Sequence, residues 1–266
     1  MARLQRWTCE YNGLTIGGAG SGVQLSEVDG LLSLPDVRTG DLELVQRHGL
    51  WPGDDYMGGR TVTLTLPVYG ETPRDFSRAL TAVQAAFTAG EEEKPFRFLF
   101  PGLAGDRAAY VKARPRKRSG PLGADFAAGV CTIVVELFAT DPHIYGDAGR
   151  TVKAVSGVVP GASPVVRLTQ EGSVPARPTV KISGAVKPRL ENLTSGEFLA
   201  VNYTGAFTVD SAREKVIASG GADITGLVDP ASAWPEYRHG AHSIRLVSGD
   251  TARRATAELS WVDTWI

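Results

Sequence analysis

The stretch Cys131-Thr-Ile-Val-Val-Glu-Leu-Phe-Ala-Thr-Asp-Pro-His-Ile-Tyr145 decides the fold. Its first half is β-branched and apolar, a composition typical of a strand with few solvent-facing positions. Asp141-Pro142 ends that strand, because proline lacks the N–H that a β-ladder needs and forces the preceding residue away from helical angles. The glycines of Gly146-Asp-Ala-Gly149 follow at once. We therefore expect the last strand of one domain here, at the point where the chain passes to the next.

The length and composition indicate a two-domain, β-rich chain. At 266 residues the sequence is long enough for two domains that each bury a core. It contains 31 glycines and 16 prolines and shows few stretches of helical periodicity, which favours an all-β or β-dominated architecture. We predict a first domain of residues 1–147 and a second domain of residues 148–266.

The charge and the apolar runs exclude several classes of protein. With 28 basic and 29 acidic residues the net charge is −1, whereas a dedicated nucleic-acid-binding domain is markedly basic. Met1–Trp7 contains no apolar run that could serve as a signal peptide, and no later stretch approaches about 18 uninterrupted apolar residues. We expect a protein made and folded in a cytoplasm, without membrane insertion, in which Cys9 and Cys131 are reduced, buried thiols.

The first domain is predicted to contain about seven strands and one inserted helix. Thr61–Leu66 is the cleanest strand, because apolar residues alternate with threonines. The helix that follows has Thr72 as its N-cap, Pro73 as its first residue and Gly90 as the C′ residue that ends it. Its apolar stripe packs against the sheet or, alternatively, faces a partner: Phe76, Leu80, Val83 and Phe87.

Two segments of the first domain are candidate contact surfaces. Gly49–Gly59 is predicted to be a long irregular loop whose aromatic residues, Trp51 and Tyr56, contact another molecule. Trp51 could equally fold back to cap its own core. The run Arg114-Pro-Arg-Lys-Arg118 is predicted at or near a hairpin tip, either solvated or in contact with an anion or partner, which makes Arg114, Arg116, Lys117 and Arg118 candidate contacts.

The second half shows short β-prone runs separated by turns and no helical pattern. Runs at this near-regular spacing predict a β-sandwich. The segment 146–164 is rich in small residues and is interpreted as a linker between the domains. Gly161–Pro164 is expected to complete this linker. The predicted strands are Val165–Thr169, Pro178–Ser183, Phe198–Asn202, Ala206–Asp210, Glu214–Ala218, His242–Ser248 and Ala255–Trp261.

The sequence carries no recognisable catalytic or metal-binding constellation. It has no G-x-S-x-G and no C-x-x-C motif. Glu236, His239 and His242 would share a face only on a helix, and Pro235 and Gly240 place them in a turn instead. We therefore predict a protein that is not an enzyme and that needs no cofactor or metal.

Several segments resemble the distal tail protein family, in particular minor tail proteins of long-tailed, non-contractile phages of actinobacteria. Leu137–Tyr145 is similar to the segment that closes the N-terminal domain in that family. Trp234–Leu246 is similar to its C-terminal signature, where an aromatic-proline turn and a glycine lead into a strand. Val180–Gly184, Leu190–Asn192 and the closing Ala257–Ile266 also fit the family pattern.

This resemblance implies a structural protein of the virion. It implies an N-terminal belt domain, a split β-barrel or sandwich with one inserted helix, that forms a hexameric ring at the tail tip, and a C-terminal galectin-like β-sandwich. The implied partners are the tail tube protein, the tail-tip hub, the tape-measure protein and peripheral receptor-binding proteins. DNA would cross the ring without specific binding, which suits the near-neutral charge.

An alternative is a carbohydrate-binding module that contacts the host cell wall through the second domain. Such a site needs an exposed aromatic ring with polar neighbours, and Tyr203 or Trp234 could supply it. Both residues also fit core or turn positions.

Overall fold

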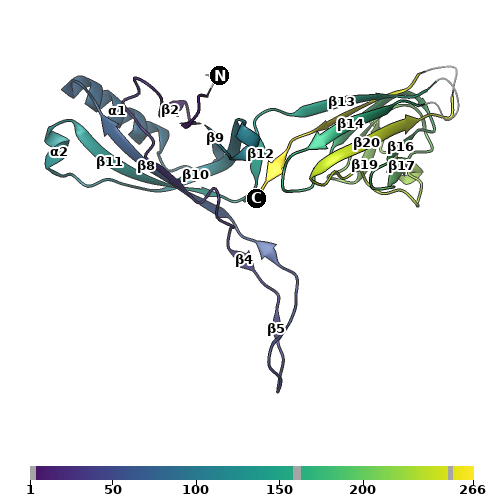
Figure 1. The fold of residues 1–266 in the computed structure, drawn as a ribbon, viewed down its shortest axis with the longest axis horizontal. Helices are drawn as coiled ribbons and strands as arrows, with labels where there is room; N and C mark the ends of the chain where they lie inside the picture. The colour runs from purple at the N-terminus through teal and green to yellow at the C-terminus, as the bar shows by residue number, and fades with distance from the viewer. Residues whose placement is uncertain (1–3, 158–162, 251–253) are drawn as a thin grey trace. The chain divides into compact units, whose positions relative to one another are not determined.

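A computed structural model describes residues 4–157, 163–250 and 254–266. The chain divides into two compact units, Met1–Asp147 with Ile266, and Ala148–Trp265 (Figure 1). Strands make up most of the regular structure in both units. None of the helices in these described ranges has the length and apolar character that a membrane span requires.

The N-terminal unit is built on one antiparallel sheet with the strand order β2-β1-β9-β10-β11-β8-β3, and β12 lies beside β10. The sheet path is open, with β2 and β3 at its two ends, so the barrel form of the predicted split barrel or sandwich is wrong. The strands are β1 (Thr8–Tyr11), β2 (Leu14–Ile16), β3 (Glu27–Asp29), β8 (Arg60–Tyr69), β9 (Lys94–Leu99), β10 (Ala109–Ser119), β11 (Val130–Ala139) and β12 (Ile144–Gly146).

Strand β10 joins the two halves of this sheet. Its first half, Ala109–Ala113, pairs with β9, and its second half pairs with β11. The register shifts between Pro115 and Lys117, and such a bulge bends and twists the strand. The one long strand therefore carries the chain from one half of the sheet to the other.

Strands β8 and β11 form the centre of the unit. All ten residues of β11 pair with β8, from Val130 opposite Tyr69 to Ala139 opposite Arg60. Val62, Leu64 and Leu66 are completely buried, so the predicted alternation of apolar residues and threonines is confirmed. The first part of Cys131–Tyr145 thus forms β11, an interior strand of the sheet. The prediction that it is the last strand of the first domain is wrong, because β12 follows the Asp141-Pro142 turn.

Helix α1 (Pro73–Ala86) begins as predicted and ends earlier. Thr72 Oγ1 accepts a hydrogen bond from the Asp75 N–H at 3.2 Å, which caps the first turn. The helix ends at Phe87 because that ring is buried and stacks on Tyr11, with the centroids 5.1 Å apart, so the chain turns there. The prediction of Gly90 as the C′ residue is wrong, since Gly90 lies beyond the turn and has no positive φ.

Other short elements complete the N-terminal unit. Strand β10 is preceded by η1 (Ala104–Asp106) and followed by α2 (Ala124–Ala127). The sequence pattern does not predict α2, which is a single helical turn. Cys9 is buried and Cys131 half-buried, both are free, and burial raises the pKa of each thiol. The prediction of buried thiols is therefore confirmed for Cys9 and only partly correct for Cys131.

Residues 31–58, which we call the arm, run between β3 and β8 as a long hairpin (Figure 1). Two short ladders hold it together, β4 (Val37–Arg38) with β7 (Tyr56–Met57) and β5 (Leu42–Glu43) with β6 (Leu50–Trp51). The prediction of an irregular loop over Gly49–Gly59 is therefore wrong, because that segment is the return half of the hairpin.

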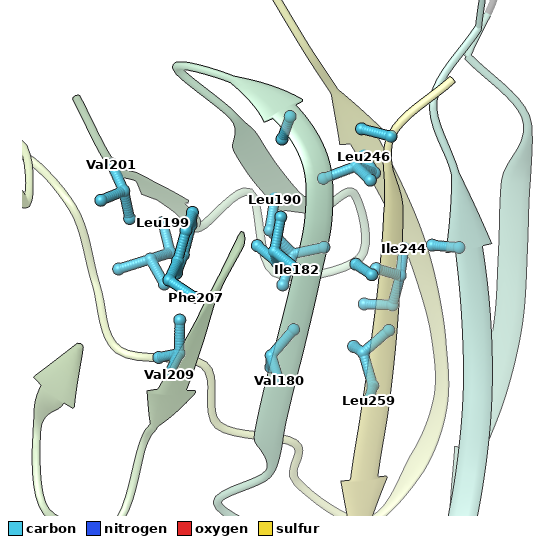
Figure 2. Packing of buried hydrophobic residues seen from close by; sticks show 14 of the residues in the cluster. Val180, Ile182, Leu190, Leu199, Val201, Phe207, Val209, Ile244, Leu246 and Leu259 are labelled. Carbon is cyan, nitrogen blue, oxygen red and sulfur yellow. The ribbon is translucent and has the colours of Figure 1, made fainter. Parts of the chain in front are cut away.

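The C-terminal unit is a sandwich of two antiparallel sheets, with the orders β13-β21-β15-β18-β19 and β14-β20-β16-β17. Figure 2 shows side chains from both sheets packed together, among them Ile182 and Leu259 from the first and Ile244 from the second. The elements are β13 (Arg150–Val155), β14 (Val165–Gln170), β15 (Thr179–Val186), β16 (Arg189–Asn192), β17 (Phe198–Ala200), β18 (Thr204–Asp210), β19 (Lys215–Ala218), η2 (Thr225–Leu227), β20 (Gly240–Val247), β21 (Thr256–Trp261) and β22 (Thr264–Trp265).

Each of the seven predicted runs of the second half coincides with a strand of this sandwich. The predicted linker is wrong over residues 150–155, because β13 pairs along its length with β21. Of the expected Gly161–Pro164 passage, Gly161 and Ala162 lie outside the described residues.

Candidate assembly site

The arm exposes most of the large apolar side chains that are exposed in the described chain. Sixteen such side chains are exposed among the described residues, and nine of them lie on the arm. A two-stranded hairpin is marginally stable alone, and clustered exposed apolar residues mark an interaction surface. The arm is therefore a candidate interaction surface. The nine are Leu32, Leu34, Val37, Leu42, Val45, Leu50, Trp51, Tyr56 and Met57.

Both candidate aromatic residues lie on this arm and are exposed. Trp51 is 65% exposed and stands opposite Leu42 on the neighbouring strand, while Tyr56 is 62% exposed and stands opposite Arg38. The alternative that Trp51 caps its own core is therefore wrong. The contact of Trp51 and Tyr56 with another subunit or partner stays a prediction.

The base of the arm is fixed by Arg60, a residue that the sequence does not single out. Its side chain is 1% exposed, and its Nη1 donates to the carbonyl oxygens of Gly30, Leu31 and Ser33 at 2.5, 3.1 and 2.9 Å. Burial lowers the pKa of Arg60 from its ordinary value. Gly30 has φ +88°, and a Cβ there would lie 2.0 Å from the Thr61 carbonyl oxygen, so only glycine fits where the chain leaves β3.

The arm is acidic as well as apolar. Among its 28 residues it carries five carboxylates and two arginines, which gives a net charge of −3 with His48 neutral. No ion pair joins any of these groups to the rest of the described chain. The carboxylates are Asp36, Asp41, Glu43, Asp54 and Asp55, and the arginines are Arg38 and Arg47.

The basic run lies in the second half of β10 rather than in the turn that follows. Arg114 donates to the Glu91 carbonyl at 3.0 Å, and Arg118 donates to the carbonyls of Gln84 and Phe87 at 2.8 and 3.3 Å. Arg118 thereby neutralises the carbonyl end of α1, where a cation is favourable. The run lies next to the turn, because β10 stays paired with β11 as far as Ser119, and Arg118 is exposed whereas Arg114 is half-buried.

The other two basic candidates face outward. The Arg116 guanidinium lies 5.3 Å from the centre of the Phe138 ring, a cation–π contact. Lys117 is exposed opposite Glu136 on β11. Whether Arg114, Arg116, Lys117 or Arg118 contacts a partner stays a prediction.

A groove opens beside this strand, at the end of the unit that carries α1 and α2. It contains a cavity of about 190 Å³ whose walls come from α1, the end of β10, the following turn and the start of β11. One lining residue, Leu122, is 80% exposed and apolar. We call this feature the groove; its lining includes Leu80, Gln84, Arg118, Leu122, Phe126 and Cys131.

The aromatic residues proposed for sugar binding pack against the sandwich core. Tyr203 is half-buried, with its ring 6.0 Å from that of Phe207 in an edge-to-face arrangement. Trp234 is half-buried beside a small cavity of about 20 Å³. Whether either residue contacts a sugar stays a prediction.

The histidines of the 236–242 segment have separate structural partners. His242 is buried, and its Nδ1 and Nε2 lie 3.2 Å from the Asn192 amide and 2.8 Å from the Arg238 carbonyl oxygen. Glu236 instead pairs with Arg177. Over the described ranges, no three His, Cys, Asp or Glu residues come together in a way that could hold a metal ion.

Comparison with known proteins gives a structural match only. Neither a protein-family profile nor a curated protein sequence matches the chain. The crystal structure of SPP1 Dit (gp 19.1), described as a paradigm of the hub adsorption apparatus in phages that infect Gram-positive bacteria, matches with a TM-score of 0.65. The match covers 97% of this chain and 99% of that chain at 16% identity. The chain has the fold of SPP1 Dit.

The likeness to SPP1 Dit extends over both units, since it covers nearly all of each chain. At 16% identity it establishes the Dit fold and nothing further. Two structures of the phage P2 baseplate in its activated conformation, with Ca and with Sr, cover 96% of this chain and 96% of theirs at 8% identity. Their TM-scores of 0.44 and 0.42 are too low to carry an argument.

Proposed function

We propose that the protein is a structural component of the distal tail tip of a long, non-contractile-tailed phage. It forms a hexameric ring that joins the tail tube to the tail-tip hub and anchors peripheral host-recognition proteins. The observation that carries this proposal is the Dit fold over nearly the whole chain. In this proposal residues 1–147 are the ring-forming belt domain and residues 148–266 are a galectin-like sandwich, and neither part is catalytic.

Physical features of the N-terminal unit support assembly. The edge strands β2 and β3 offer backbone groups for pairing, and the arm offers exposed apolar side chains. A head-to-tail contact between two different surfaces closes into a ring when the rotation between subunits divides the circle. We assign the candidate residues of the two surfaces to contacts within the ring or with its partners: Trp51 and Tyr56 on the arm, and Arg114, Arg116, Lys117 and Arg118 on β10.

The proposal places the protein in the virion. The tail tube protein lies on one side of the ring and the tail-tip hub on the other, with the tape-measure protein and receptor-binding proteins as further partners. DNA passes through the channel, and the net charge of −1 is consistent with passage without specific binding.

The oligomeric state tests the proposal. Size-exclusion chromatography with light scattering and native mass spectrometry, over a wide range of protein concentrations, should give six times the 28.3 kDa chain mass. Negative-stain images of the same fraction should show six-fold rings. A strict monomer at every concentration contradicts the proposal, and a monomer that also binds purified cell-wall glycans favours the carbohydrate-binding alternative.

A further inference from the structure

The arm and the groove are separate surfaces of the N-terminal unit with exposed apolar residues, and they lie near opposite ends of strand β8. The arm joins β8 at Arg60, whereas Cys131 of the groove pairs with Val68, near the other end of β8. Eight residue steps along a strand span about 27 Å. The molecule therefore carries two different apolar surfaces at separated places, which is the arrangement that a head-to-tail contact requires.

We propose that the arm of one copy binds in the groove of a second copy, with Trp51 in the cavity next to Cys131. The inference rests on the proposed ring and specifies which surfaces make it. The occupant of the groove is then the same chain, and every subunit uses its arm once and its groove once.

The shapes and polarity of the two surfaces fit this contact. The end of the arm presents Trp51, Leu42 and Leu50, which are each more than half exposed. The groove offers a cavity of about 190 Å³ with apolar walls from Leu80, Phe126 and Ile133. Large aromatic side chains that fill apolar cavities contribute most of the binding energy in protein interfaces.

The charges of the two surfaces are complementary. The arm has a net charge of −3, whereas β10 carries five cations and no acid, and one of these cations, Arg118, lines the groove. Within the described residues, no ion pair joins any of these five to a carboxylate, and the partners of Arg114 and Arg118 are neutral carbonyls. Opposite charges raise the rate of encounter and favour the correct partner. The five cations are Lys112, Arg114, Arg116, Lys117 and Arg118.

A cross-link between Trp51→Cys and the native Cys131 tests the contact. Cys131 lines the groove and Cys9 is fully buried, so only Cys131 offers a native thiol there. A short bismaleimide should convert W51C into a ladder of covalent multimers that ends at the hexamer. The ladder should disappear in W51C/C131S, and an exposed control cysteine on the other unit, Ala212→Cys, should give none.

Assembly measurements provide a second readout that does not depend on a reagent. Trp51→Ala and Leu122→Asp alter exposed side chains, so both variants should fold, and each should raise the protein concentration needed for half-assembly by about tenfold or more. Leu193→Ala, at an exposed apolar residue of the sandwich, should leave that concentration unchanged. Added salt should weaken wild-type assembly, since it screens the opposite charges.

The outcomes separate this inference from the proposed function. A wild-type hexamer in which W51C gives no ladder and W51A assembles normally overturns the arm-in-groove contact and leaves the ring proposal standing. A cross-link confined to single chains shows that the arm folds back on its own groove and also overturns the contact. A wild-type protein that never assembles removes the ring proposal and the inference with it.

Discussion

The Nε of Arg60 donates a hydrogen bond to the carbonyl oxygen of Pro142 at 2.7 Å, which ties the first residue of β8 to the turn after β11. The same guanidinium holds three carbonyl oxygens at the base of the arm. One buried side chain thus connects the segment that leaves the sheet for the arm with the Asp141-Pro142 turn. Because the arm projects from this point, its direction depends on Arg60.

Arg60→Met should destabilise the protein by about 3 kcal/mol, because four carbonyl oxygens lose a charged donor in a buried site. The measurement is the free energy of unfolding from chemical denaturation. Limited proteolysis should also cut the base of the arm faster. The matched control is Arg78→Ala, whose side chain is 70% exposed, and which should change stability by at most about 0.5 kcal/mol. An Arg60→Met variant as stable as that control contradicts the assigned role.

Asp141 should make stability depend on acid pH. Burial acts to raise the pKa of Asp141, but hydrogen bonds from the Tyr145 hydroxyl and from His143 outweigh it, and the pKa falls below its ordinary value. A carboxyl group with a lowered pKa stabilises the folded state above its unfolded pKa of about 3.9, and this contribution is lost as pH falls through the folded value. We expect Asp141→Asn to flatten the loss of stability below about pH 4, as measured by denaturation at a series of pH values.

Tyr145 should make stability depend on alkaline pH. Burial and then the hydrogen bond to Asp141 raise the pKa of the Tyr145 phenol, so the folded state holds this proton more tightly than the unfolded chain does. This stabilisation is complete below the unfolded pKa of about 10 and is lost as pH rises above it. Tyr145→Phe should therefore reduce the alkaline loss of stability, whereas Tyr69→Phe, at an exposed position on β8, should not. Equal alkaline slopes in Tyr145→Phe and wild type would show that the hydrogen bond has no such effect.

Sequence patterning predicts those elements whose burial follows a simple period. The alternation in Thr61–Leu66 and the cap at Thr72 identify β8 and the start of α1, because the residues that decide them are neighbours in the chain. The seven sandwich runs are found for the same reason. The end of α1 is missed because it depends on Phe87 packing against Tyr11, which is distant in sequence.

The candidate site is only partly visible in the sequence. Trp51 and Tyr56 draw attention as aromatic residues in a glycine-rich segment, but the pairing that makes them part of a hairpin is spread over Val37–Met57 and has no clear period. Arg60 resembles any polar residue at the start of a strand, and its burial follows only from the carbonyls that surround it. The groove is assembled from separate elements, so no short motif could reveal it.

Thr72→Ala should destabilise the N-terminal unit by about 1 kcal/mol, because the Asp75 N–H loses its acceptor at the start of α1. The Thr72 hydroxyl also donates to Asp75 Oδ2 at 2.6 Å, so the carboxylate loses a partner as well. Thr72→Ser keeps both hydrogen bonds and should remain within about 0.5 kcal/mol of wild type. The measurement is the free energy of unfolding of both variants, followed by circular dichroism. Equal losses in Thr72→Ala and Thr72→Ser would contradict the role of Thr72 as the N-cap.

Phe207→Ala should be the most damaging of these substitutions, with a loss of about 3–5 kcal/mol in the stability of the C-terminal unit. Phe207 is 1% exposed, lies between Ile182 and Ala218 on the neighbouring strands and contacts Tyr203, so its removal leaves a cavity that the two sheets cannot close. Fluorescence of Trp261, which is 6% exposed in the same core, reports the transition.

The matched control is Phe198→Ala in the same unit. Phe198 is only half-buried, and the Arg189 guanidinium lies 3.4 Å above its ring. An exposed cation–π contact contributes about 0.5–1 kcal/mol, so the control should lose far less stability than Phe207→Ala. Similar losses in the two variants would mean that the packing between the two sheets around Phe207 is not what holds the sandwich together.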